Sequence, residues 1–166
     1  MAKDLLLITP PFTQLNTPYP ATAYLKGFLN TKGISAFQMD LGIEVILKIF
    51  SKDGIRNIFD HAHANNSISS DNCHRINALK EDYLKTIDSV VSFLQGHNTT
   101  FARQICTPNF LPQAARFDQL DDLEWAFGSM GHQDKAKHLA TLYLEDLSDF
   151  IVECVDENFG FSRYAE

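Results

Sequence analysis

The densest cluster of potential metal ligands in the sequence lies between residues 60 and 74. It consists of Asp60-His61-Ala62-His63 and the later pair Cys73-His74. Two imidazoles and a thiolate form a ligand set that zinc accepts. However, His61 and His63 are two positions apart, and a helix would direct them to different sides. Because residues 61–73 are polar and rich in Asn and Ser, we favour a solvated loop over a zinc site and expect no metal ligands here.

A second group of candidate residues follows two short apolar runs. The run Leu5 to Ile8 ends in Thr9-Pro10-Pro11-Phe12, and the run that begins at Ile34 ends in Asp40. If both runs are parallel strands, their ends meet at the edge of the sheet where α/β proteins bind ligands. We therefore take five residues as candidate cofactor-binding residues: Thr9, Pro10, Pro11, Phe12 and Asp40.

Each candidate at this edge also has a purely structural interpretation. Asp40 would hydrogen-bond a cofactor hydroxyl or amide, or it would cap a helix that starts near Ile43, which we favour. The stretch Thr9 to Phe12 would line one face of a cofactor, or it would serve only as a rigid exit from the strand. These alternatives stay open at the level of sequence.

Signatures of covalent catalysis are missing from the sequence. It has no G-x-G-x-x-G or G-x-x-x-x-G-K-[ST] phosphate loop and no G-x-S-x-G elbow. Cys106 precedes Thr107-Pro108, but no neighbouring residue suggests a base that would activate it, so we expect a structural thiol. Trp125, Phe127 and Met130 are more typical of a core than of a cofactor site. We therefore predict no catalytic residue in this chain.

Composition limits the partners and the compartment. The 166 residues carry a formal charge of −7, which argues against nucleic acid or an anionic membrane surface as a partner. No apolar stretch approaches the roughly 20 residues that span a bilayer, and the N-terminus lacks a secretory signal.

The three cysteines, Cys73, Cys106 and Cys154, are far apart and odd in number. This pattern predicts free thiols in a reducing, cytoplasmic compartment.

The last third of the chain is strongly acidic. Its acidic residues are Glu145, Asp146, Asp149, Glu153, Asp156 and Glu157. We interpret this segment as the solvated face of a helix.

The first forty residues predict a strand, a helix and a second strand. The first strand covers about Asp4 to Thr9, and its continuous apolar run is typical of a strand buried on both faces of a parallel sheet. Pro11 ends it because proline lacks an amide hydrogen. A helix follows from about Pro18–Ala21 and stops at Gly33, and the second strand begins at Ile34. The apolar stripe expected to bury this helix is Ala21, Tyr24, Leu25, Phe28 and Leu29.

The remaining residues look helical. The periodicity predicts a helix over residues 43–62 with an interruption at Gly54, a loop over 61–73, and a long helix from Ile76 to Leu94 closed by Gly96. An irregular stretch (99–112), a helix over 120–130 and a final helix over 139–154 follow.

Two strands are too few for a stable sheet, since roughly three or more are usually needed. The missing strands would lie beyond Glu166 or come from another chain. A bare strand edge pairs with other chains. We therefore expect the isolated chain to form a homodimer or to exchange elements between chains.

The opening residues resemble the cobalamin-binding-type domain that precedes the catalytic barrel of many radical S-adenosylmethionine (radical SAM) proteins. The matching features are Leu5 to Ile8, Pro10-Pro11, Pro18 and Pro20, Tyr24-Leu25, Gly33, and Asp40-Leu41. The resemblance covers about the first 42 residues. It implies an α/β fold, mostly helical, with one βαβ unit of a Rossmann-like parallel sheet over residues 1–42. A helical insertion would occupy residues 43–158, and residues 159–166 would lead into the rest of the protein.

The same resemblance implies an accessory N-terminal region of an iron–sulfur enzyme, which helps to position cofactor or substrate over a downstream radical SAM barrel. The parent protein would use a [4Fe-4S] cluster, S-adenosylmethionine and cobalamin. The chain itself lacks the Asp-x-His-x-x-Gly motif of histidine-ligated cobalamin and the Cys-x3-Cys-x2-Cys motif of the cluster. It should therefore hold no cluster and perform no radical chemistry alone. The alternatives are a helical protein-interaction module without cofactor, or a hydrolase or transferase of unrecognised type.

Overall fold

The computed structural model describes residues 5–11, 20–118 and 131–160. It divides into two compact units, one reaching to Lys48 and one starting at Ile49. Three predicted features lie outside the described residues: the side chain of Phe12, the helix over 120–130 and the final segment 161–166.

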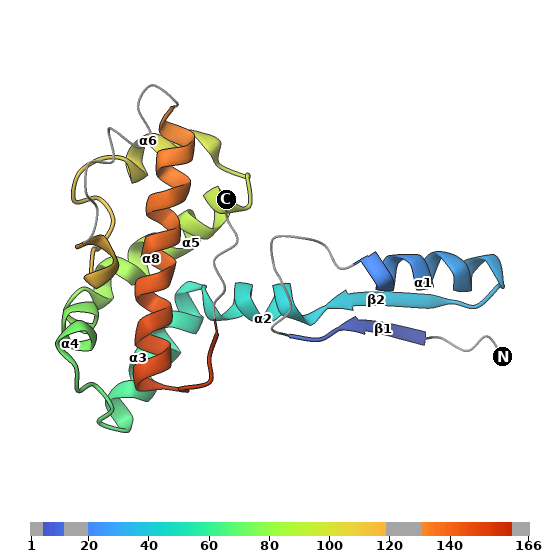
Figure 1. Cartoon of the computed structure of the whole chain (residues 1–166), viewed down its shortest axis with the longest axis horizontal. Coiled ribbons are helices and arrows are strands. Elements are labelled where there is room, and N and C mark those ends of the chain that lie inside the picture. Colours follow the sequence, from blue (N-terminus) through green and yellow to red (C-terminus); the bar gives the residue numbers. More distant parts are fainter. Residues whose placement is uncertain (1–4, 12–19, 119–130, 161–166) are drawn as a thin grey trace. The chain divides into compact units, whose positions relative to one another are not determined.

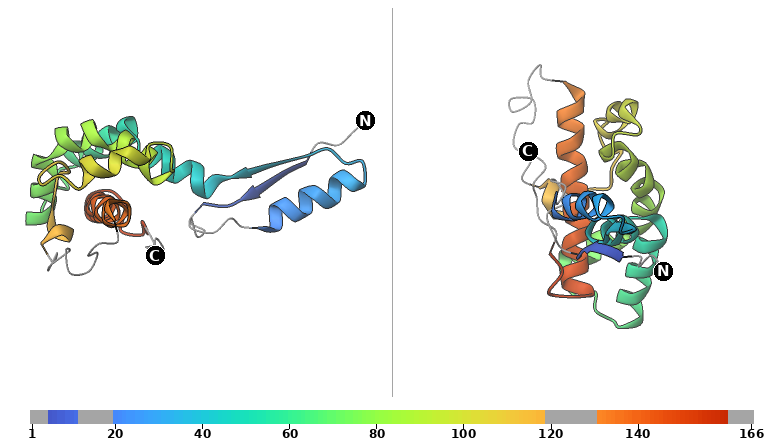
Figure 2. Two further views of the ribbon diagram at one scale, coloured as in Figure 1. Left: turned by 90° about the horizontal axis from the view of Figure 1, so that it is seen from above. Right: turned by 90° about the vertical axis from the view of Figure 1, so that its right-hand side faces the viewer.

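The first unit is built on two parallel strands and the helix between them (Figures 1 and 2). Strand β1 covers Leu5–Thr9, helix α1 covers Pro20–Thr31 and strand β2 covers Ala36–Asp40. The strands pair in parallel, from Leu5 opposite Ala36 to Thr9 opposite Asp40. Gly33, at φ +70°, ends α1 in the left-handed conformation that glycine adopts without strain. The predicted α/β order of strand, helix and strand is confirmed, within a chain that is mostly helical.

The two faces of the sheet differ in how they are covered. Side chains alternate between the faces, so Thr9 and Ala36 share one face and Leu6, Ile8 and Phe37 share the other. Helix α1 packs against the strands, and Thr9 and Ala36 are buried at 2% and 7% exposure. On the opposite face Leu6, Ile8 and Phe37 are exposed at 54%, 46% and 58%. The prediction of a first strand buried on both faces is wrong for this chain, because nothing in its described residues covers the second face.

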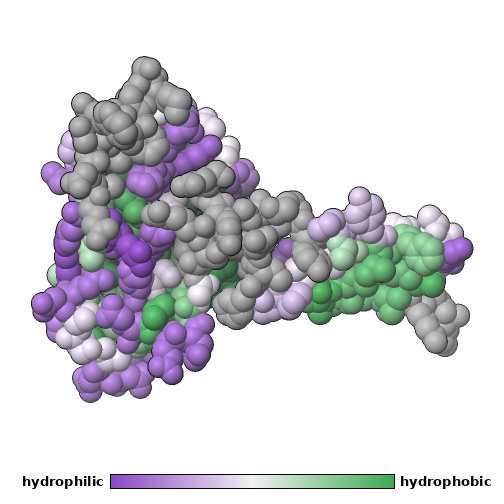
Figure 3. Space-filling view, viewed as in Figure 1, coloured by the Kyte–Doolittle hydropathy of each residue, from purple (hydrophilic) through white to green (hydrophobic). Residues whose placement is uncertain are grey.

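Helix α1 also differs from expectation. No residue of α1 is buried, and the predicted apolar stripe leaves Tyr24, Leu25 and Phe28 exposed at 77%, 51% and 59%. A large apolar area follows α1 and the strands in the space-filling view (Figure 3). The stripe was expected to pack on the sheet, but most of it faces away from the two strands that are present.

The described residues of the second unit form helices and 3-10 turns joined by loops. Its main helices are α3 (Lys52–Ala64), α4 (Asp71–Ala78), α5 (Lys80–Leu94) and α8 (His132–Cys154), with the short α6 at Ala102–Ile105 and 3-10 turns at Thr99–Phe101 and Ala115–Phe117. Two aromatic pairs fix α8 in the core. Phe150 lies against Phe59 of α3 with ring centroids 4.8 Å apart, and Tyr143 lies against Tyr83 of α5 at 5.0 Å. All four side chains are fully buried.

Helix boundaries in this region are set by caps that periodicity did not reveal. Helix α2 covers Leu41–Ile49, and α3 starts afresh because the Ser51 hydroxyl accepts a hydrogen bond from the Gly54 amide at 3.1 Å. Gly54 therefore lies inside the first turn of α3. The prediction that Gly54 interrupts a helix is wrong. The predicted long helix from Ile76 is likewise two helices, divided at Leu79.

Two stretches predicted as irregular are partly helical. The predicted loop over 61–73 shrinks to residues 65–70, because α3 continues to Ala64 and the Ser70 hydroxyl caps the start of α4 through the Cys73 amide at 3.1 Å. The irregular stretch 99–112 contains a 3-10 turn and α6. The final predicted helix is confirmed and begins earlier, at His132.

The acidic segment is only partly solvated. Asp146 is fully buried, and its carboxylate accepts hydrogen bonds from the backbone amides of Ala114 and Arg116 at 2.8 and 3.0 Å. One turn further on, Asp149 makes a bidentate ion pair with the Arg116 guanidinium. The interpretation as a solvated helix face is therefore wrong for Asp146, whose carboxylate ties the segment after α6 to α8. No described helix is long and apolar enough to cross a membrane.

Candidate functional site

The carboxyl ends of β1 and β2 lie side by side, as the candidate residues required. Thr9 and Asp40 are partners in the parallel register. Thr9 is 2% exposed, so its side chain belongs to the packing between sheet and helix rather than to an open surface. Pro10 and Pro11 leave the strand immediately afterwards, with Pro10 exposed and Pro11 half-buried. Phe12 lies outside the described residues.

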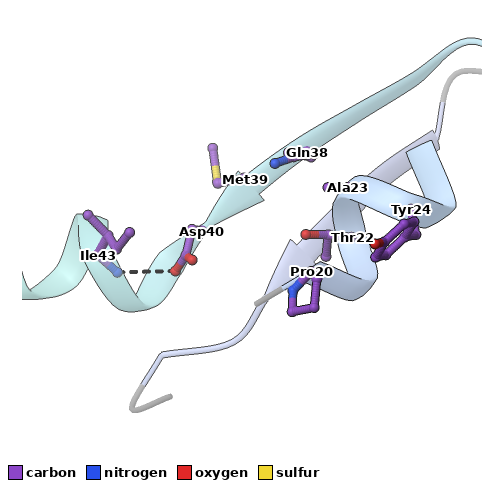
Figure 4. A pocket seen from close by; sticks show the side chains of 8 residues that line it. All are labelled: Pro20, Thr22, Ala23, Tyr24, Gln38, Met39, Asp40 and Ile43. Carbon is purple, nitrogen blue, oxygen red and sulfur yellow. Dashed lines mark hydrogen bonds between the residues drawn. The ribbon is translucent and has the colours of Figure 1, made fainter. Parts of the chain in front are cut away.

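A cleft of about 600 Å³ opens beside this edge, within the first unit (Figure 4). It is lined by Pro20, Thr22, Ala23, Tyr24, Gln38, Met39, Asp40 and Ile43. Of the predicted site residues, the structure places Asp40 in the lining, whereas Thr9, Pro10 and Pro11 are not part of it.

The first turn of α1 supplies half of the lining and was not predicted from the sequence. Pro20 starts the helix, a position where proline is well tolerated. Thr22, Ala23 and Tyr24 follow and line the α1 side of the cleft (Figure 4). The signal was available in principle, because the helix of a βαβ unit begins at the same edge where the strands end. Its backbone N–H groups there lack intrahelical partners and favour a ligand that accepts hydrogen bonds.

Asp40 has the capping role that we favoured from the sequence. Its Oδ1 accepts a hydrogen bond from the Ile43 amide at 3.2 Å, which makes it the N-cap of α2. The same side chain borders the cleft. The carboxylate therefore begins a helix and lies at the edge of the cleft.

We expect Asp40→Ala to destabilise the first unit by about 1 kcal/mol, because the Ile43 amide loses its capping acceptor. Asp40→Asn is the matched control, since the amide oxygen still caps a helix. Chemical denaturation of the chain would measure both. Equal losses in the two variants would show that the cap contributes nothing.

The polar groups of the cleft suit binding rather than covalent chemistry. The Thr22 hydroxyl, the Gln38 amide and the Asp40 carboxylate offer both donors and acceptors, while Met39 and Ile43 provide apolar surface. No lining residue pairs a nucleophile with a base. The arrangement can hold a partly apolar molecule by a few directed hydrogen bonds.

The candidate zinc ligands are used in separate contacts. Asp60 pairs with the Lys80 ammonium at 2.9 Å, and His63 Nε2 lies 2.9 Å from the Asn77 side-chain oxygen. Cys73 lies instead against α8. Among the residues that the structure describes, no three His, Cys, Asp or Glu side chains are grouped in a way that would hold a metal ion.

Cys106 has the surroundings of a structural thiol. Its Sγ lies 3.5 Å from the backbone oxygen of His132, so the contact is to the peptide and not to the imidazole. Burial raises the pKa of the Cys106 thiol, which disfavours the thiolate that a nucleophile needs.

The helical unit has a cleft of its own, of about 430 Å³, bordered by Arg75 and residues 109–113. The Arg75 guanidinium bonds to Asp118 at 2.8 and 3.0 Å and to the Gln113 backbone oxygen at 3.1 Å. This cation is thus engaged in holding the loop rather than in receiving an anion.

Comparison with known proteins finds no matching family model, no matching curated protein and no matching solved structure.

Proposed function

We propose that this chain is an accessory N-terminal region of a cobalamin-binding-type radical SAM enzyme. In this role its βαβ unit forms one part of a larger Rossmann-like parallel sheet, and the cleft at the end of β2 helps to position a cofactor or substrate. The helical unit is an insertion after the second strand. The single observation that carries the proposal is the parallel strand pair whose second face is apolar and, among the described residues, exposed.

The exposed residues support an incomplete sheet rather than a finished domain. Parallel sheets are almost always covered on both faces by helices. Here Leu6 and Phe37 are opposite one another in register, both more than half exposed, and Ile8 continues the same face. The outer stripe of α1 adds Tyr24 and Phe28. Both surfaces are what neighbouring strands and helices of a doubly wound sheet would cover.

The helical unit supports this proposal over a helical interaction module. Among its described residues, the large apolar side chains that are exposed are Leu94 and Val155, at 37% and 38%. They are isolated positions at the ends of α5 and α8. The extensive apolar surface belongs instead to the βαβ unit, where a continuing sheet would bury it.

In this proposal, the radical reaction and the positioning of the cofactor belong to different parts of the parent protein. The radical reaction and its [4Fe-4S] cluster belong to the downstream barrel, because the three cysteines of this chain lack the required spacing. The cleft would receive part of a cofactor such as cobalamin without a histidine ligand, through the α1 N-terminus, Thr22 and Asp40.

The reading frame beyond codon 166 tests the first half of the proposal. We expect it to encode a Cys-x3-Cys-x2-Cys motif followed by a barrel. A frame that ends without such a motif would eliminate the radical SAM assignment.

A binding experiment on the full-length protein tests the second half. We expect hydroxocobalamin to bind with a shift in its visible spectrum, and Ala23→Trp to weaken binding by at least about tenfold because the indole fills the cleft. Gln95→Trp, on the exposed end of α5, is the matched control. Equal affinity in both variants would remove the cleft from the cofactor site.

A further inference from the structure

Two cysteines that are 81 positions apart in the sequence meet inside the helical unit. The Sγ atoms of Cys73 and Cys154 lie 3.1 Å apart. Both side chains are buried, at 1% and 4% exposure, and both are free thiols in this structure. The third cysteine, Cys106, contacts a backbone oxygen elsewhere.

The supporting elements make a bond between these sulfurs feasible. Cys73 is in the first turn of α4, and Cys154 is the last residue of α8, which packs against α4. A disulfide needs an S–S distance of about 2 Å. The sulfurs must therefore approach by about 1 Å to form the bond.

The groups around Cys73 offer a proton acceptor, although burial and the nearby Glu153 carboxylate both raise the pKa of its thiol. Its Sγ lies 3.2 Å from Glu153 Oε2, so an exposed carboxylate accepts the thiol hydrogen bond and is placed to receive the proton. Its amide donates to the Ser70 hydroxyl, which in turn donates to the same Glu153 oxygen. The N-terminal end of α4 adds the partial positive charge that stabilises a thiolate.

We propose that Cys73 and Cys154 form a redox site that reacts with low-molecular-weight disulfides, such as oxidised glutathione. The Cys73 thiolate attacks one sulfur of the small disulfide, breaks its S–S bond and releases one reduced thiol. The Cys154 thiolate then attacks the Cys73 sulfur of the mixed disulfide and releases the second. Two cysteines are oxidised, one small disulfide is reduced to two thiols, and the two protons pass from the cysteines to the released thiols.

The product joins α4 to α8 across a long stretch of chain. Because it restricts the unfolded state, a bond closing a loop of this size stabilises the fold. Burial raises the pKa of Cys73 to about 12 and raises that of Cys154 as well, so attack is slow at neutral pH and depends on transient opening of this end of the unit. The site therefore responds to sustained oxidation rather than to brief exposure.

In the test, the 166-residue chain is incubated with oxidised glutathione in the native state and, separately, during refolding. Refolding exposes both thiols and so removes any limit set by burial. We expect the thiol count to fall from three to one, with loss of about 2 Da and a peptide map that joins Cys73 to Cys154. The oxidised chain should melt about 5–10 °C higher, and dithiothreitol should reverse the change.

Matched variants make the result specific. Cys106→Ser should behave like the wild type, whereas Cys73→Ser and Cys154→Ser should form no internal bond. The melting curve of each reduced variant checks that it folds. Three remaining thiols after both treatments, a stable mixed disulfide with glutathione, or a bond that includes Cys106 would each overturn the proposal.

Discussion

Replacing Asp146 with alanine is expected to lower the free energy of unfolding of the helical unit by about 2–6 kcal/mol, because two backbone amides lose their acceptor. The fully buried carboxylate accepts the amides of Ala114 and Arg116 at 2.8 and 3.0 Å. Without it these donors lose their acceptor inside the protein, and an unsatisfied buried donor costs about 1–3 kcal/mol. Chemical denaturation followed by circular dichroism measures the loss.

Two controls separate the hydrogen bonds from charge and side-chain volume. Asp146→Asn keeps one acceptor oxygen, so we expect about half of the loss. Asp149→Ala, one turn away, removes the partly exposed ion pair with Arg116 and should cost no more than about 1 kcal/mol. Similar losses in Asp146→Ala and Asp149→Ala would contradict the assigned role of the buried carboxylate.

The pH dependence of this effect has a defined sign. Burial raises the pKa of Asp146, against the two backbone donors that lower it. The folded state then holds this proton to a higher pH than the unfolded chain. The contribution of Asp146 is therefore greatest below its unfolded pKa of about 4 and declines as pH rises through the folded pKa. The stability advantage of the wild type over Asp146→Asn should therefore shrink as the pH rises above about 4.

A second large effect is expected from one charge on the uncovered face of the sheet. We expect the chain to self-associate through this face and the bare edge of β1, and Phe37→Lys to raise the dissociation constant at least about 100-fold. Phe37 is 58% exposed beside Leu6, so burying a lysine there would leave an unpaired ammonium in the interface. Sedimentation equilibrium and light scattering measure the association.

Leu94→Lys is the matched control, because Leu94 is an exposed apolar residue of the helical unit. It should associate like the wild type. Circular dichroism checks that Phe37→Lys keeps its fold. A wild-type chain that stays monomeric at about 100 µM, well above the dissociation constants of specific complexes, would contradict the prediction.

The sequence revealed the parts of the fold that depend on local patterns. The proline pair and the short apolar run located β1 within a residue, and Gly33 located the end of α1. The divisions at Ser51 and Leu79 were missed because apolar periodicity continues across a cap. The burial of β1 was harder to predict than its position. Its apolar run is typical of a strand inside a complete sheet, whereas the structure describes a pair of strands.

The functional features that were missed all depend on contacts between distant segments. Asp40 was predicted for this edge because it directly follows an apolar run, and it lines the cleft. The first turn of α1 enters the cleft only once the helix folds back over the strands. Cys73 and Cys154 are separated by 81 positions, and no spacing rule connects them. Asp146 looked like one of several surface carboxylates until the loop after α6 was placed against α8.

Asp40 would also couple ligand binding in the cleft to the stability of the first turn of α2. Strand β2 ends at this residue and α2 begins at the next, with no linker between them. A ligand that bonds Oδ1 of this carboxylate therefore competes with the Ile43 amide for the same oxygen atom. Occupancy of the cleft would then loosen the first turn of α2, and faster amide-hydrogen exchange at Ile43 would report the bound molecule.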